Sequence, residues 1–226
     1  MLSIVDLRQR GTVTPELAAY LLAALGGGAS FMVGAVPGGA GKTTVMGALL
    51  NFLPAEVPLL PADGLAAIER GRAPGQPRAC YICHEIGPGD YYAYLWGAEL
   101  RAYFELPTAG HILATNLHAD DLAQARDQIC GDNGVPEAAF RRMHLALFLR
   151  VEGGWQGKRQ LVEVWESDGL QPHRRVFHQG HLELPASRRV TQPQWDTAAA
   201  RMERLLASGA QTIDQVRAHL VAGENP

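Results

Sequence analysis

A glycine-rich segment between an apolar run and a helical run, Gly38–Thr44, most limits how this chain can fold. The apolar run 31–36 before it suits a buried parallel strand. Residues Lys42 to Phe52 read as a helix, which Pro54 closes. A glycine-rich turn from a strand into a helix is typical of a phosphate-binding loop. We therefore predict that a nucleotide binds to its seven residues, Gly38, Gly39, Ala40, Gly41, Lys42, Thr43 and Thr44.

The closing half of this segment matches the pattern G-x-x-x-x-G-K-[ST], whereas Val36 occupies the position of the opening glycine. Glycines let consecutive backbone N–H groups curl around phosphate oxygens, and the helix dipole adds a favourable field. We expect Lys42 to reach the β- and γ-phosphates of ATP, and the Thr43 hydroxyl to ligate Mg²⁺. The alternative is an ordinary glycine-rich turn with a chance lysine, which the flanking strand and helix disfavour.

Three more short apolar runs follow the loop, at 57–60, 79–83 and 111–115. Helical segments separate them, and this alternation predicts an α/β fold with a mainly parallel sheet flanked by helices. Two later runs, 145–151 and 160–166, are joined by a glycine-rich turn and predict an antiparallel β-hairpin that extends the sheet. The expected helical segments are 14–25, 64–70, 92–106, 121–130, 136–143, 194–206 and 213–222.

With 226 residues, the chain is long enough for one substantial core, or for one core plus a small appendage. We predict a nucleotide-binding core over residues 1–170, with the hairpin near 145–166. An irregular linker is expected over 171–190, where no periodicity is visible. The last two helical segments predict a small C-terminal helical appendage over 191–226.

Charge and cysteine content narrow the class of protein further. Hydrophobic residues make up 47% of the chain, which favours a packed globular domain. The formal net charge is −3 and no dense run of Lys and Arg occurs, which argues against binding to nucleic-acid phosphates or anionic lipid. Glycines interrupt the longest uncharged stretch, so we expect no membrane span. Without a signal-peptide pattern and with three cysteines, the expected location is cytoplasmic, at most peripheral to a membrane.

Polar side chains stand close to the ends of three predicted strands, namely Asp63, Glu85 and His118. In an open parallel sheet, ligands bind beyond the carboxyl ends of the strands. A carboxylate near the γ-phosphate can orient and deprotonate the attacking water, or help to hold Mg²⁺. Glu85 is the first candidate, and a helix-capping or surface glutamate is its alternative. For Asp63 the alternative is a turn residue before Gly64, and His118 can be a γ-phosphate sensor or a structural histidine. The predicted catalytic residues are Lys42, Asp63, Glu85 and His118, and the predicted Mg²⁺ ligands are Thr43 and Glu85.

Several segments between residues 6 and 166 combine with the loop into a wider pattern. Ahead of the loop stand Asp6-Leu7 and Gly11-Thr12-Val13, and after it Leu50-Asn51-Phe52-Leu53-Pro54 leads to Asp63. The most specific segment is Thr108–Asp120, which reads T-A-G-H-I-L-A-T-N-L-H-A-D. It is similar to T-G-H-x-x-x-S-T-x-H-T-N, the His box of secretion and type IV pilus ATPases. The chain thus resembles the VirB11/PilT/GspE-like superfamily, and most closely its CpaF/TadA branch.

This resemblance implies a RecA-like P-loop NTPase core, with Gly38–Thr44 as its Walker A loop. Glu85 would be the catalytic glutamate of the atypical Walker B strand, Asp63 would close the Asp box, and His118 would be the His-box histidine. The resemblance also implies a homo-oligomer, a hexameric ring. Such a ring would use ATP hydrolysis to move components of pilus or secretion machinery.

The chain also departs from the pattern of this family. Relatives carry an N-terminal domain that closes over the nucleotide and contributes arginines. A short segment precedes the loop here, so we expect that domain to be absent. The family's Gly-Glu-x-Arg-Asp reads His84-Glu85-Ile86-Gly87-Pro88, which lacks the arginine. Together with Val36, these departures favour weakened turnover. Candidates to replace the missing cations are Arg70, Arg72, Arg78, Arg101 and Arg126.

Cysteine and histidine clusters invite a second interpretation as metal sites. Cys80 and Cys83 are three apart on a predicted strand, so they point to opposite faces and cannot share one metal. Buried core cysteines are therefore expected. His173, His178 and His181 stand in the predicted irregular segment, where a solvated loop is favoured over a metal site.

Aromatic residues gather after Glu85, on the segment predicted as the helix 92–106. Such a group can form a contact surface for a neighbouring subunit or simply pack in the core. Sequence alone leaves both interpretations open. The residues are Tyr91, Tyr92, Tyr94, Trp96 and Tyr103.

Three functions from different classes follow from these features. The first is an ATPase of the secretion or type IV pilus type that hydrolyses ATP with Mg²⁺ as an oligomer. The second is a nucleotide-binding switch or scaffold that has lost catalytic closure, which the missing domain and arginine suggest. The third is a nucleic-acid-driven motor, which the acidic balance disfavours.

Overall fold

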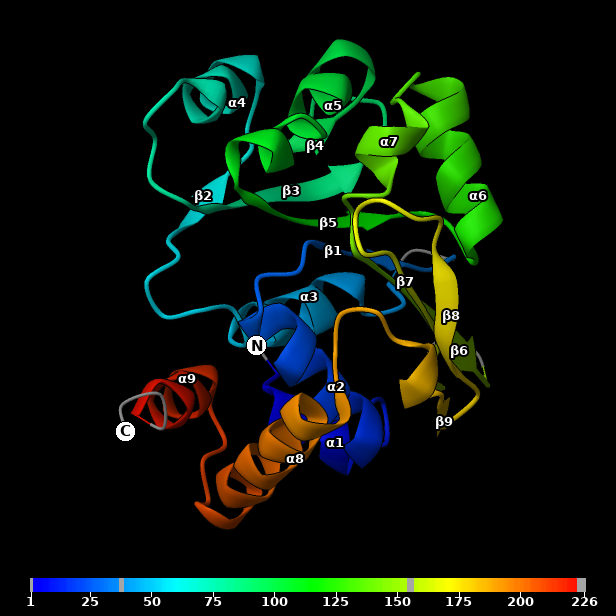
Figure 1. Ribbon diagram of the computed structural model, residues 1–226. Coiled ribbons are helices and arrows are strands. Elements are labelled where there is room, and N and C mark those ends of the chain that lie inside the picture. The colour runs from blue at the N-terminus through cyan, green and yellow to red at the C-terminus, as the bar shows by residue number, and fades with distance from the viewer. Residues whose placement is uncertain (1, 37–38, 154–156, 223–226) are drawn as a thin grey trace.

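The computed structural model describes residues 2–36, 39–153 and 157–222 of the chain, so Gly38 and the middle of the hairpin turn lie outside the described residues. Figure 1 shows one sheet between two layers of helices, which confirms the predicted α/β fold. The RecA-like detail stays a prediction. One layer consists of α4 (Leu65–Arg72), α5 (Gly97–Tyr103), α6 (Leu122–Arg126) and α7 (Glu137–Phe140). The other contains α1 (Ile4–Gln9), α2 (Pro15–Gly26), α3 (Lys42–Leu50) and α8 (Gln192–Ala207).

The described strands form one mixed sheet. Its strands are β1 (Phe31–Gly34), β2 (Leu59–Pro61), β3 (Cys80–Ile86), β4 (Tyr94–Leu95), β5 (Ile112–Leu117), β6 (Leu145–Glu152), β7 (Lys158–Glu166), β8 (Arg174–His178) and β9 (His181–Leu182). Their order is β2-β3-β5-β1-β6-β7-β8-β9, with β4 paired to β3. Pairing is parallel from β2 to β6 and antiparallel from β6 to β9. The predicted parallel sheet and its hairpin extension are therefore both present.

Each face of the sheet has its own apolar cluster. Along β1, Phe31 and Val33 belong to the cluster under α1, α2 and α3, whereas Met32 belongs to the cluster on the opposite face. This alternation follows from the two-residue period of a strand. Cys80 and Cys83 likewise fall into different clusters, which confirms that the two thiols face apart. Burial raises the pKa of each thiol to about 12.

The two C-terminal helices pack close to α2 and α3. The indole Nε1 of Trp195 on α8 donates to the carbonyl of Glu16 at 3.1 Å. Arg217, on α9 (Ile213–Ala222), donates to the carbonyl of Asn51 at 2.9 Å. The predicted helices at 194–206 and 213–222 are thus present, and the division into core and appendage stays a prediction. None of the described helices is long and apolar enough to cross a membrane.

The segment after β3 differs from the prediction of one long helix over 92–106. It forms the short strand β4 and then α5, because Tyr94 and Leu95 pair with Glu85 and Ile86 of β3. This added pairing also carries β3 through Glu85, which was expected beyond the end of the strand. The aromatic group is consequently not on one helix. Tyr91 and Tyr92 are exposed in the preceding loop, whereas Tyr103 is buried in α5.

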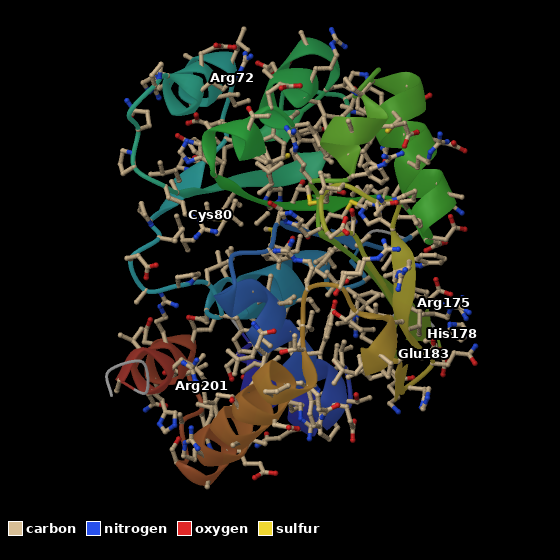
Figure 2. All side chains as sticks on the ribbon, viewed as in Figure 1. Arg72, Cys80, Arg175, His178, Glu183 and Arg201 are labelled. Carbon is tan, nitrogen blue, oxygen red and sulfur yellow. The ribbon has the colours of Figure 1, made fainter. Side chains whose placement is uncertain are left out.

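The expectation of an irregular segment over 171–190 is wrong, because β8 and β9 lie there and continue the sheet from β7. His178 is paired across the two strands with His181. Figure 2 shows Arg175 and His178 together on this side of the sheet. His173 is half-buried, not solvated, and its Nε2 contacts the carbonyl oxygen of Met143 at 2.6 Å. Among the described residues, no group of three or more His, Cys, Asp or Glu side chains could hold a metal ion.

Candidate functional site

The loop after β1 enters α3 through two glycines in the left-handed region. Gly39 has φ +79° and Gly41 has φ +101°, conformations that favour glycine. Gly41 is the N-cap of α3, and no side chain caps this helix. The first-turn N–H groups of a helix lack intrahelical acceptors, and the helix dipole is positive there. The described part of the loop therefore offers backbone donors to an anion.

Close contacts fix the strand that leads into this loop. A Cβ on Gly34 would lie 2.6 Å from the carbonyl oxygen of Ala119 and 2.8 Å from the ring of Phe148, so only glycine fits. Two residues on, the N–H of Val36 donates to Oδ1 of Asp120 at 2.8 Å. The side chain of Val36 is 46% exposed and packs in no core. Asp120, which was not among the predicted site residues, thus ties the loop to the segment after β5.

Three of the four predicted catalytic residues meet beside the loop. Nζ of Lys42 lies 3.4 Å from Oε1 of Glu85, and Nε2 of His118 lies 3.5 Å from the same oxygen. Nζ also lies 3.3 Å from Nδ1 of His118. The side chains of Lys42 and Glu85 are each 7% exposed, whereas that of His118 is 49% exposed. The charged pair is therefore buried, and the histidine forms its solvent side.

The strand order explains this meeting. Because β5 lies between β1 and β3, His118 at the end of β5 stands between Lys42 and Glu85. The pairing of β3 with β5 shifts between Cys83 and Ile86, an irregularity that often marks functional sites. Beside it, Nδ2 of Asn116 donates to the carbonyl of His84 at 2.9 Å and holds the two strands together.

A cavity of about 380 Å³ borders these side chains and the loop. Its lining includes Gly39 to Thr44, Glu85, Tyr94 and His118. Oε1 of Glu85 is buried and receives no hydrogen bond from the described residues, so its close polar contacts are Nζ of Lys42 and Nε2 of His118. Such a carboxylate retains capacity to accept a proton or a hydrogen bond from a bound molecule.

Tyr94 lines this cavity although no site prediction included it. Its ring stacks on that of His84, with centroids 5.8 Å apart. Partial burial, and then the nearby carboxylate of Glu85, raise the pKa of its hydroxyl. Tyr94 was recognised in the sequence only as part of an aromatic group. Its place in the site depends on the strand pairing of β4, which the helical interpretation of 92–106 concealed.

Asp63 is not part of this group. It is exposed after β2, and no described contact joins it to Lys42, Glu85 or His118. The arginines considered as replacements for the missing cations also make their described contacts away from Lys42, Glu85 and His118. Arg72 pairs with Glu69, Arg101 donates to the carbonyl of Asn133, and Arg126 pairs with Glu137. Arg70 is exposed and does not line the cavity beside the loop. Arg78 lines a different cavity, at the opposite edge of the sheet.

Arg159 of β7, which was not among these candidates, contacts the loop. Its Nη2 donates to the carbonyl of Gly39 at 3.5 Å. It lines a second cavity, of about 420 Å³, on the α1 side of the loop. This cavity combines apolar and cationic walls, formed by Leu2, Leu7, Val45, Leu149, Arg10, Lys158 and Arg159. The sequence did not predict this cavity, because only the order of the strands in the sheet brings β7 close to the loop.

The side chains beside the loop fit the hard-cation chemistry of Mg²⁺. The hydroxyl of Thr43 is exposed at the start of α3, and the carboxylate of Glu85 lines the same cavity. Nucleotide-bound Mg²⁺ usually takes one or two protein oxygens and completes its shell with phosphates and water. Two oxygen donors in one cavity therefore suffice as a protein contribution.

Comparisons with known proteins identify distant structural likenesses. No family model matches the sequence, and no curated protein matches it. The chain is similar to the VirB11 ATPase of the Brucella suis type IV secretion system, solved in complex with sulphate, with a TM-score of 0.49 and 17% identity. That match covers 66% of this chain and 51% of the VirB11 chain. A second likeness is to the Legionella pneumophila ATPase DotB, with a TM-score of 0.44 and 10% identity over 87% of this chain and 58% of DotB.

VirB11 is one of the proteins that give their names to the superfamily that the sequence resembles. The CpaF/TadA branch stays a prediction. The chain spans little more than half the length of these two ATPases. Likenesses this distant assign no activity, substrate or partner to the chain. What its site can do follows from its own residues.

Proposed function

We propose that this chain is a P-loop ATPase of the secretion or type IV pilus type, which hydrolyses ATP with Mg²⁺. One observation carries the proposal. The lysine of a glycine-rich phosphate loop is paired, in a buried position, with a carboxylate that borders a cavity at the carboxyl edge of a parallel sheet. Lys42 supplies a cation for the phosphates, and Glu85 supplies an acceptor for the proton of an attacking water.

The two cavities beside the loop suit the two ends of a nucleotide. The phosphates would lie over the loop, where the N–H groups of α3 and Lys42 face the cavity that Glu85 lines. The base and ribose would occupy the cavity on the α1 side, whose apolar walls Leu7 and Val45 can cover a ring. Arg159 lines the cavity on the α1 side and contacts Gly39, which borders both cavities, so it would contact the phosphates as well.

Each residue beside the loop has a task in this proposal. Phosphate oxygens would draw Nζ of Lys42 away from Oε1 of Glu85, because a triphosphate carries more charge than one carboxylate. Glu85, released from this pair, would then orient a water and accept its proton. His118, exposed on the solvent side of the pair, would donate a hydrogen bond to the γ-phosphate. When bound, Mg²⁺ neutralises charge that develops on the phosphate oxygens, and Thr43 and Glu85 would help to hold it.

Assembly and location belong to the same proposal. We expect a homo-oligomer, a hexameric ring, that works in the cytoplasm on components of pilus or secretion machinery. Within the chain, Arg159 contacts the loop through the carbonyl of Gly39. An arginine from a neighbouring subunit would complete the site. The exposed side chains Tyr91 and Tyr92, 70% and 71% accessible, are candidates for the contact between subunits.

Phosphate release measured against protein concentration, with light scattering on the same samples, tests the proposal. The expected result is Mg²⁺-dependent release that rises as the protein assembles and disappears in Lys42→Ala. Arg204→Ala, an exposed arginine on α8, is the matched control and should behave like the wild type. Measurable ATP binding without release in an assembled protein would contradict the proposal. That result would favour the nucleotide-binding switch, and steep stimulation by single-stranded DNA would favour a nucleic-acid motor.

A further inference from the structure

A third cavity, of about 370 Å³, opens at the edge of the sheet opposite the loop. The segments that precede β1, β3, β5 and β6 line it, which places it at the amino ends of the parallel strands. The turn after β7 closes one side. The cavity shares no lining residue with the two cavities beside the loop, so the proposed ATPase chemistry gives it no role. Its lining includes Gly28, Arg78, Arg142, Asp168, Gly169 and Arg189.

The walls of this cavity carry an excess of positive charge. Arg78, Arg142 and Arg189 come from distant parts of the sequence, and Asp168 is the one carboxylate beside them in the described lining. Backbone N–H groups, that of Gln171 foremost, hydrogen bond to Asp168 and lower its pKa, so it stays ionised. Three guanidinium groups lie beside the carboxylate of Asp168, and even with the carboxylate of Glu166 behind Arg189 counted, positive charge is in excess.

Two of the three guanidinium groups make no ion pair and no side-chain hydrogen bond within the described part of the chain, although the carboxylate of Glu166 attracts Arg189. Arg142 and Arg189 take part in no ion pair there, and Nε of Arg189 is buried without a hydrogen bond. The carboxylate behind Arg189 is Glu166, whose oxygens accept from the hydroxyl of Tyr20 and the N–H of Arg188, each at 2.6 Å. A buried donor without an acceptor lowers stability, and a bound anion would remove that penalty.

Neighbouring backbone and side chains hold this positive surface in place. Nη2 of Arg78 donates to the carbonyl of Gly28 at 3.4 Å, and a Cβ on Gly28 would lie 1.8 Å from the same nitrogen. Only glycine therefore allows Arg78 this position. His144, also in the wall, accepts the N–H of Ser30 through Nδ1, and burial lowers its pKa to about 3. The histidine is neutral at physiological pH, so the arginines supply the charge.

From these contacts we infer that the cavity binds a small phosphate-bearing anion through Arg78, Arg142 and Arg189. Guanidinium groups donate paired N–H bonds that match phosphate oxygens. The excess of positive charge suits an anion, and the volume admits a small phosphate. Inorganic phosphate, pyrophosphate and a phosphomonoester share this chemistry. The inference does not rest on the proposed function.

Titration of the ¹⁵N-labelled chain with pyrophosphate, followed by NMR, tests the site directly. Saturable shifts are expected at the backbone N–H groups of Gly28 and Gly169 and at Nε–H of Arg189. Arg142→Ala should weaken this response at least tenfold, and Arg142→Lys, which keeps the charge but loses the planar fork, should weaken it less. Arg204→Ala is the matched control and should leave it unchanged. Inorganic phosphate and glycerol phosphate, titrated separately, distinguish the free anion from a phosphomonoester.

Two results would contradict a phosphate site in this cavity. Shifts confined to Gly39–Thr44 would show that phosphate binds the nucleotide loop and not this cavity. Shifts that sodium chloride reproduces at equal ionic strength would show general screening of surface arginines. Either result overturns the inference and leaves the ATPase proposal untouched. Because Arg142 makes no described ion pair, Arg142→Ala should fold, and its thermal midpoint in phosphate-free buffer should equal or exceed that of the wild type.

Discussion

Nζ of Lys42 and Oε1 of Glu85 lie 3.4 Å apart at a place where each side chain is only 7% exposed. A buried ion pair contributes little net stability, but the loss of one partner leaves an uncompensated buried charge. The pair is therefore better explained by function than by folding. In the proposed function, it would keep a phosphate-binding cation and a candidate base together until a ligand separates them.

Lys42→Ala should lower the free energy of unfolding by about 3–5 kcal/mol, because Glu85 loses its buried partner. The double variant Lys42→Ala/Glu85→Gln should recover part of that loss, which a double-mutant cycle in urea measures. The exposed pair Arg72 and Glu69 is the control, with an expected coupling of about 0.5 kcal/mol or less. Equal coupling in the two pairs would show that burial of Lys42 and Glu85 has no energetic consequence.

Gly34→Ala should destabilise the protein by about 1–3 kcal/mol, since its Cβ would overlap the backbone of Ala119 and the ring of Phe148. Because these contacts set the start of the loop, nucleotide affinity should fall as well. Gly131→Ala is the matched control, as a Cβ there would meet nothing within 4 Å. Thermal unfolding and fluorescent-nucleotide binding measure both effects. Equal unfolding temperatures and equal nucleotide affinities in Gly34→Ala and Gly131→Ala would contradict the close approach of Ala119 and Phe148 to Gly34.

The alternation of apolar and helical segments was enough to predict the α/β fold, and three of the four catalytic candidates lie together as expected. Their meeting was predictable because carboxyl ends of parallel strands share one edge of a sheet. Tyr94 was missed, since its place depends on the two-residue strand β4. Arg159 was missed for another reason: the contact between β7 and the loop spans 120 residues of sequence. Local patterns carry no information on such pairings.

Asp120→Ala should weaken nucleotide binding by about tenfold, because the N–H of Val36 loses its acceptor and the loop loses its tie to β5. Global stability should change little, since Asp120 is exposed. Asp132→Ala, another exposed aspartate, serves as control. Isothermal titration with ADP compares the three proteins. Unchanged affinity in Asp120→Ala would mean that this hydrogen bond does not position the loop.

His144 should make stability depend on pH in a defined window. Burial lowers its pKa from 6.5 to about 3 in the folded protein. As the pH falls from 6.5 toward 3, the unfolded chain takes up a proton that the folded chain refuses, so stability falls by at most about 1.4 kcal/mol per unit. His144→Asn retains an acceptor for the N–H of Ser30 and should lose this dependence. Urea midpoints at pH 7 and pH 5 measure the difference, with the exposed His181→Asn as control.

His118→Ala should slow phosphate release at least tenfold while changing nucleotide affinity less. The reason is that His118 stands on the exposed side of the Lys42–Glu85 pair, where it can contact the γ-phosphate but does not form the loop. Release and binding are measured on the same protein. His181→Asn is again the control. A loss of binding equal to the loss of release would assign His118 to binding alone.

The most direct test compares ATP binding and phosphate release in Glu85→Gln. The amide keeps the size of the carboxylate but cannot accept a proton from water. We expect binding within about threefold of the wild type and release reduced by at least a hundredfold, as expected for loss of a general base. Asp63→Asn, an exposed carboxylate without a described contact to the site, should leave both unchanged. Release by Glu85→Gln at the wild-type rate would contradict the account.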